Sequence, residues 1–173
     1  LIEEPIAAAI GANLPISEAT GSMVIDIGGG TTEIAVMSLG GVVYSNSLRV
    51  AGDAMDQAMI GYMRKEYNLM IGDSTAEKIK KEIGTAIATN NNTYAVKGRD
   101  LRSGTPKEIN ITEEDTVAAL NPILREMING IKDALENTPP ELSADLVDMG
   151  LTLTGGGALL KNIDKRLTKE TGL

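Results

Sequence analysis

Three short runs rich in apolar and β-branched residues predict strands near the start of the chain. They cover MVIDI at 23–27, EIAVMS at 33–38 and VVYSNSLRV at 42–50. The connections GGGTT and LGG are short enough to join antiparallel neighbours. A fourth apolar run, GLTLT at 150–154, predicts a buried strand much later in the chain.

Apolar residues three or four positions apart predict helices elsewhere. Pro5 opens the first helix, because a proline in the first helical turn costs no hydrogen bond. The residue before a proline disfavours the helical conformation, so Glu4 is expected at the junction between loop and helix. We expect Ile6, Ala9 and Ile10 to face the core.

From Gly52 onward the apolar period becomes 3.6, which is typical of helices. Two stripes predict two helices separated by a GDS loop, in which Ser74 is a candidate cap for the second helix. The stripes are Met55, Met59, Met63 and Tyr67, followed by Ile79, Ile83 and Ile87. Beyond them, TYAVKG and KEINI predict a hairpin around RSGTP.

Two helical patterns occupy the last third of the chain. Thr112 precedes three acidic residues and predicts the start of a helix, which Pro122 either kinks or divides. ALLKNIDKRLTKETG predicts a closing helix that begins directly after a glycine turn and ends at Gly172. Its inward residues are expected to be Leu159, Leu160, Ile163 and Leu167.

The predicted elements define a mixed α/β fold with a small inserted lobe. A meander of strands is followed by helices and a hairpin, then by a long helix and a final strand–helix unit. The change of composition predicts that residues 53–117 form a small α+β lobe inserted into a larger lobe built from 1–52 and 118–173.

The composition of the 173 residues excludes several chemistries. The chain has no Cys and no His, which removes thiol nucleophiles, disulfides, histidine-based triads and zinc sites. Without Trp or Phe, and with a net charge of −8, it lacks the aromatic and basic surface that nucleic acids need. No apolar run approaches the ~18 residues of a membrane span, and no signal-peptide pattern is present, so we expect an intracellular protein.

The strongest chemical signal is DIGGGTT, from Asp26 to Thr32, at the end of the first strand. Glycines let backbone N–H groups approach an anion, hydroxyls add donors, and a carboxylate can hold the hydrated Mg²⁺ of a nucleotide phosphate. The alternative is an ordinary hairpin turn, in which glycine supplies positive φ and aspartate makes a local turn.

Two weaker signals lie elsewhere. TGGGALL, from Thr154 to Leu160, ends a strand and opens a predicted helix, so it could present N–H groups to a flat ligand, or could be a tight turn needed only for packing. Glu77 and Lys80 are spaced as an exposed ion pair on a helix, which by itself has no functional meaning. Taken together, the two glycine-rich strand ends suggest a nucleotide held between turns.

Beyond these motifs, the chain resembles the second half of the MreB family of bacterial actins over essentially its whole length. The matching segments, in collinear order, are LIEEPIAAAIGA, MVIDIGGGTTEIAVMS, RVAGDAMDQA, AEKIKKEIG, NTPPELSADL and GLTLTGGGALLKN. Hsp70 ATPase domains and sugar kinases share the glycine motifs, but not the EEP-AAAIGA and TPPEL-AD segments. The resemblance implies domain II of an actin-like (ribonuclease H-like) ATPase fold.

The resemblance also implies a site for ATP or ADP with Mg²⁺. Asp26 matches the residue near the metal ion, while Glu4, with help from Thr31, matches the residue that positions the attacking water. The implied phosphate-binding residues are Gly28, Gly29, Gly30, Thr31 and Thr32. The implied base- and ribose-binding residues are Glu77, Lys80, Gly155, Gly156 and Gly157.

The family's function is expected to follow. The resemblance implies a cytoskeletal ATPase that polymerises with ATP and organises cell-wall synthesis and rod shape. Such a protein would work with morphogenesis membrane proteins at the inner face of the cell membrane. The family's first half, with its own phosphate loop and membrane contact, is not in this sequence, which we therefore expect to be a fragment. Alone, this chain should fold but bind ATP weakly and not hydrolyse it.

Two other classes remain open from the sequence. One is an Hsp70-like chaperone ATPase or a cell-division actin homologue with the same core. The other is a non-catalytic interaction module whose glycines only shape turns.

Overall fold

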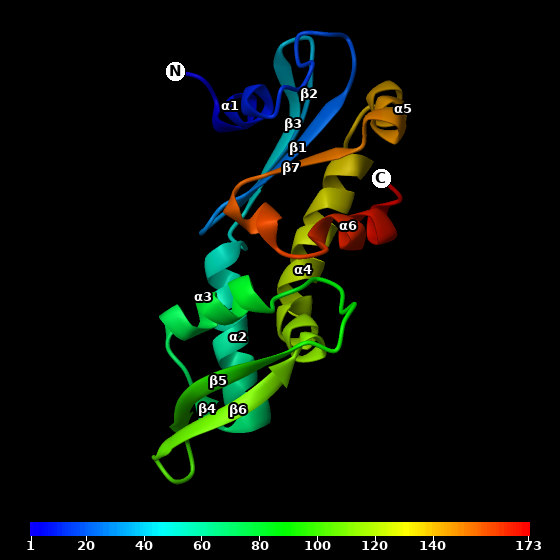
Figure 1. Cartoon of the computed structure of the whole chain (residues 1–173). Helices are drawn as coiled ribbons and strands as arrows, with labels where there is room; N and C mark the ends of the chain where they lie inside the picture. Colours follow the sequence, from blue (N-terminus) through cyan, green and yellow to red (C-terminus); the bar gives the residue numbers. More distant parts are fainter. The chain divides into compact units, whose positions relative to one another are not determined.

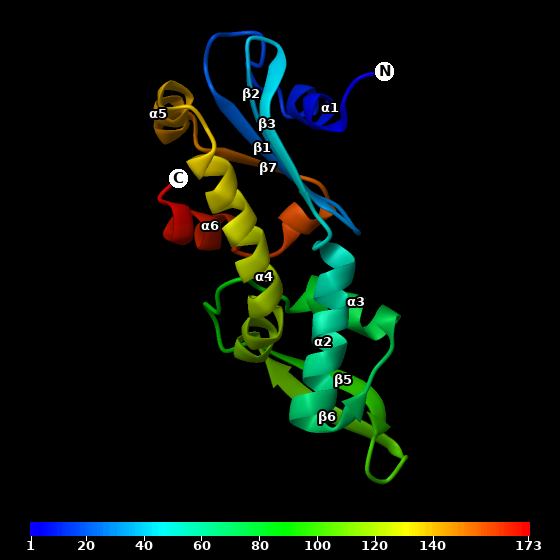
Figure 2. The same ribbon diagram turned by 180° about the vertical axis from the view of Figure 1, so that it is seen from behind.

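A computed structural model describes all residues, 1–173, and divides the chain into two compact units (Figures 1 and 2). The first unit comprises Leu1–Gly52, Glu126–Leu159 and Leu167–Leu173. The second unit comprises Asp53–Arg125 and Leu160–Arg166. The chain therefore crosses between the units several times, and each unit gathers segments that are distant in sequence.

A four-stranded sheet forms the centre of the first unit. β1 (Ser22–Ile27), β2 (Thr32–Ser38) and β3 (Gly41–Leu48) make an antiparallel meander, which confirms the three predicted strands. β7 (Leu151–Thr154) joins β1 in parallel, so the sheet has the order β3-β2-β1-β7. β7 confirms the predicted strand, but it is half-buried along its length, so the prediction that it is buried was wrong.

Helices cover both faces of this sheet (Figures 1 and 2). α1 (Glu4–Gly11) packs on one face, where Ala9 meets Val24, Ala35 and Met37 in a buried cluster. On the other face, α4 (Glu113–Glu136) passes so close at Gly130 that a Cβ there would lie 3.3 Å from the side chain of Ile34. The sheet is therefore the middle layer of the unit, and the apolar residues of β1 and β2 are buried on both of its faces.

α1 differs from its prediction in two respects. The Ala7 N–H donates to the Glu3 carbonyl at 3.0 Å, so the first turn already includes Glu4 despite the proline that follows it. Ile10 is 54% exposed rather than buried, whereas Ile6, Ala8 and Ala9 pack against the sheet.

The second unit combines two helices with a three-stranded sheet. α2 (Gly52–Tyr67) buries its methionine stripe completely, as predicted. α3 (Asp73–Glu82) begins after Gly72 with no side-chain cap, so Ser74 lies inside the first turn and is not the cap. The helix also ends at Glu82, before Ile87, and Gly84 then lies so close to its last turn that a Cβ there would overlap the Lys80 carbonyl.

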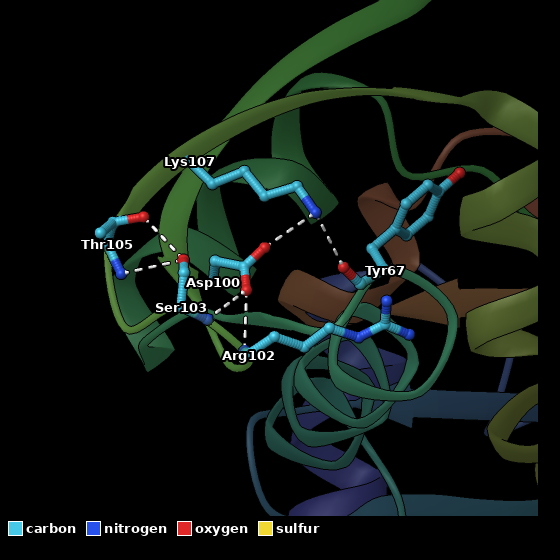
Figure 3. Close-up of polar contacts among 6 residues, drawn as sticks. All are labelled: Tyr67, Asp100, Arg102, Ser103, Thr105 and Lys107. Atoms are coloured by element: carbon cyan, nitrogen blue, oxygen red, sulfur yellow. Dashed lines mark hydrogen bonds and ion pairs between the residues drawn. The ribbon is translucent and has the colours of Figure 1, made fainter.

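The sheet of the second unit has the order β4-β5-β6. β4 (Leu69–Met70) pairs with β5 (Thr93–Asp100), which forms the predicted hairpin with β6 (Pro106–Thr112). Asp100 organises the hairpin loop: it accepts from the Arg102 and Ser103 N–H groups at 2.7 and 3.0 Å and pairs with Lys107 at 3.2 Å (Figure 3). These hydrogen bonds and this ion pair lower the pKa of Asp100 to about 2.

α4 starts as the sequence predicted and is not divided by Pro122. Thr112 Oγ1 accepts from the Asp115 N–H at 3.3 Å, while Asp115 accepts from the Thr112 N–H at 2.8 Å, which is a reciprocal helix cap. The hydroxyls of Tyr62 and Tyr67 also donate to Asp115, at 2.8 and 2.9 Å. Burial alone would raise the pKa of Asp115, yet these hydrogen bonds hold it below its ordinary value.

The closing helix is shorter than predicted. Gly156–Leu159 form a 3₁₀ turn, η1, and α6 (Ile163–Thr171) begins only after Asn162, which has a φ of +60°. Leu159 is 86% exposed, so its predicted inward position was wrong, while Leu160, Ile163 and Leu167 are buried. α5 (Pro140–Met149) completes the list of helices, none of which is long and apolar enough to cross a membrane.

Candidate functional site

The loop from Gly28 to Thr31 joins β1 to β2 and is held by three backbone and side-chain contacts. The Gly28 N–H donates to the Thr31 carbonyl at 2.9 Å, and the Gly28 carbonyl accepts from the Gly52 N–H at 3.1 Å. The buried Thr32 hydroxyl donates to the Val50 carbonyl at 2.6 Å. The fold thus uses the Thr32 hydroxyl to anchor the loop, while Gly29, Gly30 and Thr31 are exposed.

The second glycine-rich turn follows β7 and packs against the end of β1. Gly155 has a φ of +82°, and a Cβ there would overlap both Asp26 Oδ1 and the Ile27 carbonyl oxygen. A Cβ on Gly157 would overlap the side chain of Ile27. Glycine is therefore required at both positions by the close approach of the turn to β1.

Parallel pairing brings the two predicted motifs together. Asp26 on β1 lies opposite Thr154 on β7, so DIGGGTT and TGGG leave neighbouring strands at the same edge of the sheet. Asp26 follows Val24 by two residues and so lies on the face of the sheet that α1 covers. Glu4 is the exposed first residue of that helix.

Two glycines at this edge are not explained by the packing of the chain. A Cβ on Gly30 or on Gly156 would meet no atom within 4 Å, and neither residue has a positive φ. Positive φ belongs instead to Gly155, so the turn needs its special conformation one residue earlier than Gly156. Gly28 is intermediate, since a Cβ there would lie 3.4 Å from the Thr31 carbonyl oxygen.

The remaining predicted binding residues, Glu77 and Lys80, lie on α3 in the second unit. They do not form the expected ion pair with each other. Lys80 pairs with Asp56 of α2 at 2.8 Å, and both side chains are largely buried. Glu77 pairs with Lys81 at 2.7 Å, and this hydrogen bond and charge lower the pKa of Glu77. Glu77 thus pairs one position beyond the spacing that the sequence suggested, whereas Lys80 pairs with a residue of another helix.

One further residue of this edge was not predicted. The hydroxyl oxygen of Thr154 is buried without a hydrogen-bond partner in the chain, although it lies opposite Asp26. Its place directly before three glycines was visible in the sequence, but the missing partner could be found only in the structure.

The sheet order, the meander and the two glycine-rich turns at one edge agree with the actin-like fold that the sequence resemblance implies. The family model described as "MreB/Mbl protein" matches residues 1–173, and the chain belongs to this family. This match favours the bacterial actins over the Hsp70-like and cell-division alternatives that the shared glycine motifs left open.

Curated relatives agree with the family. The chain is 52% identical to the cell shape-determining protein MreB of Escherichia coli (strain K12) over 174 residues, which cover 100% of the chain and 50% of the relative. It is 44% identical to the cell shape-determining protein Mbl of Bacillus subtilis (strain 168), covering 98% of the chain and 51% of that protein. The chain therefore spans about half the length of the curated relatives that it matches.

Solved structures show the same fold. The structure of MreB5 of Spiroplasma citri bound to AMPPNP superposes with a TM-score of 0.95 at 42% identity, covering 99% of this chain and 52% of that one. MreB5 bound to ADP gives a TM-score of 0.96 at the same identity. The predicted actin-like fold is confirmed.

Proposed function

We propose that this chain is the nucleotide-binding half of an actin-like cytoskeletal ATPase that binds ATP or ADP with Mg²⁺. The relatives named as cell shape-determining proteins support a role in rod shape, and the structures of MreB5 with AMPPNP and ADP support the nucleotide. Two lobes of the family fold would correspond to the two units, with 53–117 as the inserted lobe. Hydrolysis would be an activity of the full-length protein.

The observation that carries the proposal is the pair of unexplained glycines. Gly30 and Gly156 lie on the two turns that meet beside Asp26, and neither is needed for backbone conformation or for packing. Glycines are useful in such places when backbone must approach a bound phosphate or a flat base. In the proposed site, Gly28, Gly29, Gly30 and Thr31 face the phosphates, while Thr32 holds the loop in place.

The residues at this edge fit a Mg²⁺ ion that is shared with phosphates. The chain has no group of three or more carboxylates that could hold a metal ion. Mg²⁺ bound with a nucleotide commonly uses one or two carboxylates together with phosphate oxygens and water. Asp26 would be that carboxylate, and the ion would supply positive charge to the phosphates.

Glu4 and Thr31 are the proposed catalytic residues. Glu4 begins the helix that covers the face on which Asp26 lies, and Thr31 ends the exposed loop. A carboxylate and a hydroxyl can orient a water molecule for attack on a phosphorus atom, which is most of what phosphoryl-transfer sites do. Glu77, Lys80, Gly155, Gly156 and Gly157 complete the proposal as residues of the nucleoside side.

The cellular part of the proposal follows from the family. Filaments of the full-length protein would lie at the inner face of the cell membrane and act with membrane proteins of the cell-wall machinery. No contact with nucleic acid is proposed, because the net charge is −8 and the chain has only four aromatic residues, all tyrosines.

The test is a titration of the full-length protein with Mg-AMPPNP, comparing the wild type with Gly156→Val. A branched side chain at Gly156 should weaken binding at least tenfold, because it occupies the space proposed for the nucleotide, and should leave the melting temperature nearly unchanged. Gly61→Val is the matched control: Gly61 on α2 also has open space around it, and this variant should alter neither quantity. Absence of binding by the wild type, or equal affinity of wild type and Gly156→Val, would contradict the proposed site and favour a turn-shaping role for the glycines.

A further inference from the structure

The hydroxyl of Thr154 is an unusual group for a strand end. Its oxygen is buried and has no hydrogen-bond partner in the chain. A buried hydroxyl without a partner destabilises the folded state, since it has lost its hydrogen bonds to water. Other buried threonines of this protein avoid this cost: Thr32 donates to a carbonyl at 2.6 Å and Thr138 to another at 2.7 Å.

The carboxylate of Asp26 is an acceptor on the neighbouring strand, at the position paired with Thr154. Asp26 and Thr154 are direct partners in the parallel pairing of β1 with β7, so their side chains leave the same face of the sheet. Neighbouring strands are about 4.8 Å apart, and rotation about the side-chain torsions brings a hydroxyl and a carboxylate at such positions within hydrogen-bond reach. Gly155, where a Cβ would overlap Asp26 Oδ1, keeps the turn against this carboxylate.

We propose that Thr154 is a positioning residue, whose hydroxyl donates to the Asp26 carboxylate when that carboxylate faces a Mg²⁺–nucleotide complex. This inference rests on the proposed function of the site. A carboxylate that serves a metal ion has one oxygen directed at the ion or its water, and the other oxygen is commonly held by a second hydrogen bond. The Thr154 hydroxyl can donate to that second oxygen, because it has no other hydrogen-bond partner in the chain.

Under this proposal, removing the Thr154 hydroxyl should raise the stability of the nucleotide-free protein and lower its affinity for Mg-AMPPNP. Thr154→Val keeps the shape of the side chain and removes the hydroxyl. Without nucleotide, the variant should melt about 2–4 °C higher than the wild type, because a buried polar group without a partner is gone. With Mg-AMPPNP, its affinity should fall about tenfold, because the carboxylate loses the hydrogen bond that orients it.

The experiment uses the full-length protein, Mg-AMPPNP as the probe, and AMPPNP with excess chelator as the metal-free comparison. Thr154→Val should lose most of the gain in affinity that Mg²⁺ gives the wild type, and should bind metal-free AMPPNP as the wild type does. Thr154→Ser retains the hydroxyl and should restore the gain. Asp26→Asn should lose the same gain, and adding Thr154→Val to it should cause no further loss.

Three results would overturn the inference. The first is a Thr154→Val variant that gains as much affinity for AMPPNP from Mg²⁺ as the wild type does. The second is a Thr154→Val variant that loses equal affinity for AMPPNP with and without Mg²⁺. The third is a lower melting temperature of nucleotide-free Thr154→Val, which would mean that the hydroxyl serves the fold. Failure of the wild type to bind Mg-AMPPNP at all would instead refute the proposed function, so the two failures are distinguishable.

Discussion

The turn after β7 contains both a glycine that the fold requires and a glycine that it does not require. Gly155 and Gly156 are adjacent, and they differ in conformation and in surroundings. Gly155 has a φ of +82° and no room for a Cβ, whereas Gly156 has neither restriction. Alanine at each position therefore tests the described packing of the turn, independently of any ligand.

The expected cost of Gly155→Ala has two parts. Placing an alanine in the left-handed conformation costs about 1–2 kcal/mol. The new Cβ must also displace both Asp26 Oδ1 and the Ile27 carbonyl, and forcing extra volume into a packed site costs roughly 1–3 kcal/mol. The sum, about 2–5 kcal/mol, is a large part of the 5–15 kcal/mol that typically stabilises a protein. Gly156→Ala should instead be neutral or stabilise the fold by up to about 1 kcal/mol.

The assay is denaturant unfolding of both variants and the wild type, without nucleotide, followed through the midpoint and slope of the transition. We expect a clearly lower midpoint for Gly155→Ala and no decrease for Gly156→Ala, with similar slopes. Equal midpoints for the two variants would refute the reasoning, because the turn could then not lie against the end of β1 as described.

Two further predictions concern other parts of the chain. Glu4→Ala in the full-length protein should abolish most phosphate release from ATP and change the affinity for Mg-AMPPNP little, because a residue that orients water acts on the transition state. Equal loss of phosphate release and of affinity would mean that Glu4 has a structural role. Asp100 has a pKa of about 2 in the fold, below its ordinary 3.8, so its contribution to stability is present above pH 3.8 and is lost as the pH falls toward 2. The amide NMR signals of Arg102 and Ser103 should change between pH 4 and pH 2 as this contribution is lost, and the change should be absent in Asp100→Asn. A pH-dependent change that persists in Asp100→Asn would show that another group titrates.

Local patterns in the sequence predicted most of the secondary structure. Runs rich in strand-forming residues predicted the meander of β1 to β3 and the hairpin of β5 and β6, and the stripe of Met55, Met59 and Met63 predicted a helix with a buried face. Thr112 and Asp115 form the cap expected at the start of α4. These features depend on residues close in sequence, so the pattern contains the information that determines them.

Helix ends and exposure were less predictable where packing decides them. Ser74 could have capped α3, but the helix begins one residue earlier, and α6 starts at Ile163 because the preceding residues form a 3₁₀ turn against β1. Leu159 and Ile10 fit an apolar stripe and yet are exposed, since a stripe shows which residues could be buried and not whether another element covers them.

The candidate site divides in the same way. The sequence by itself identified the candidate site residues, because Asp26, its glycines and TGGG are recognisable as motifs and as family positions. Only the tertiary structure decided that β7 pairs with β1, that Gly155 is required by packing while Gly30 and Gly156 are not, and that Lys80 pairs with Asp56. The reason is physical: strand pairing, steric clearance and ion pairing depend on atoms brought together from distant parts of the chain, and no local pattern specifies which atoms those are.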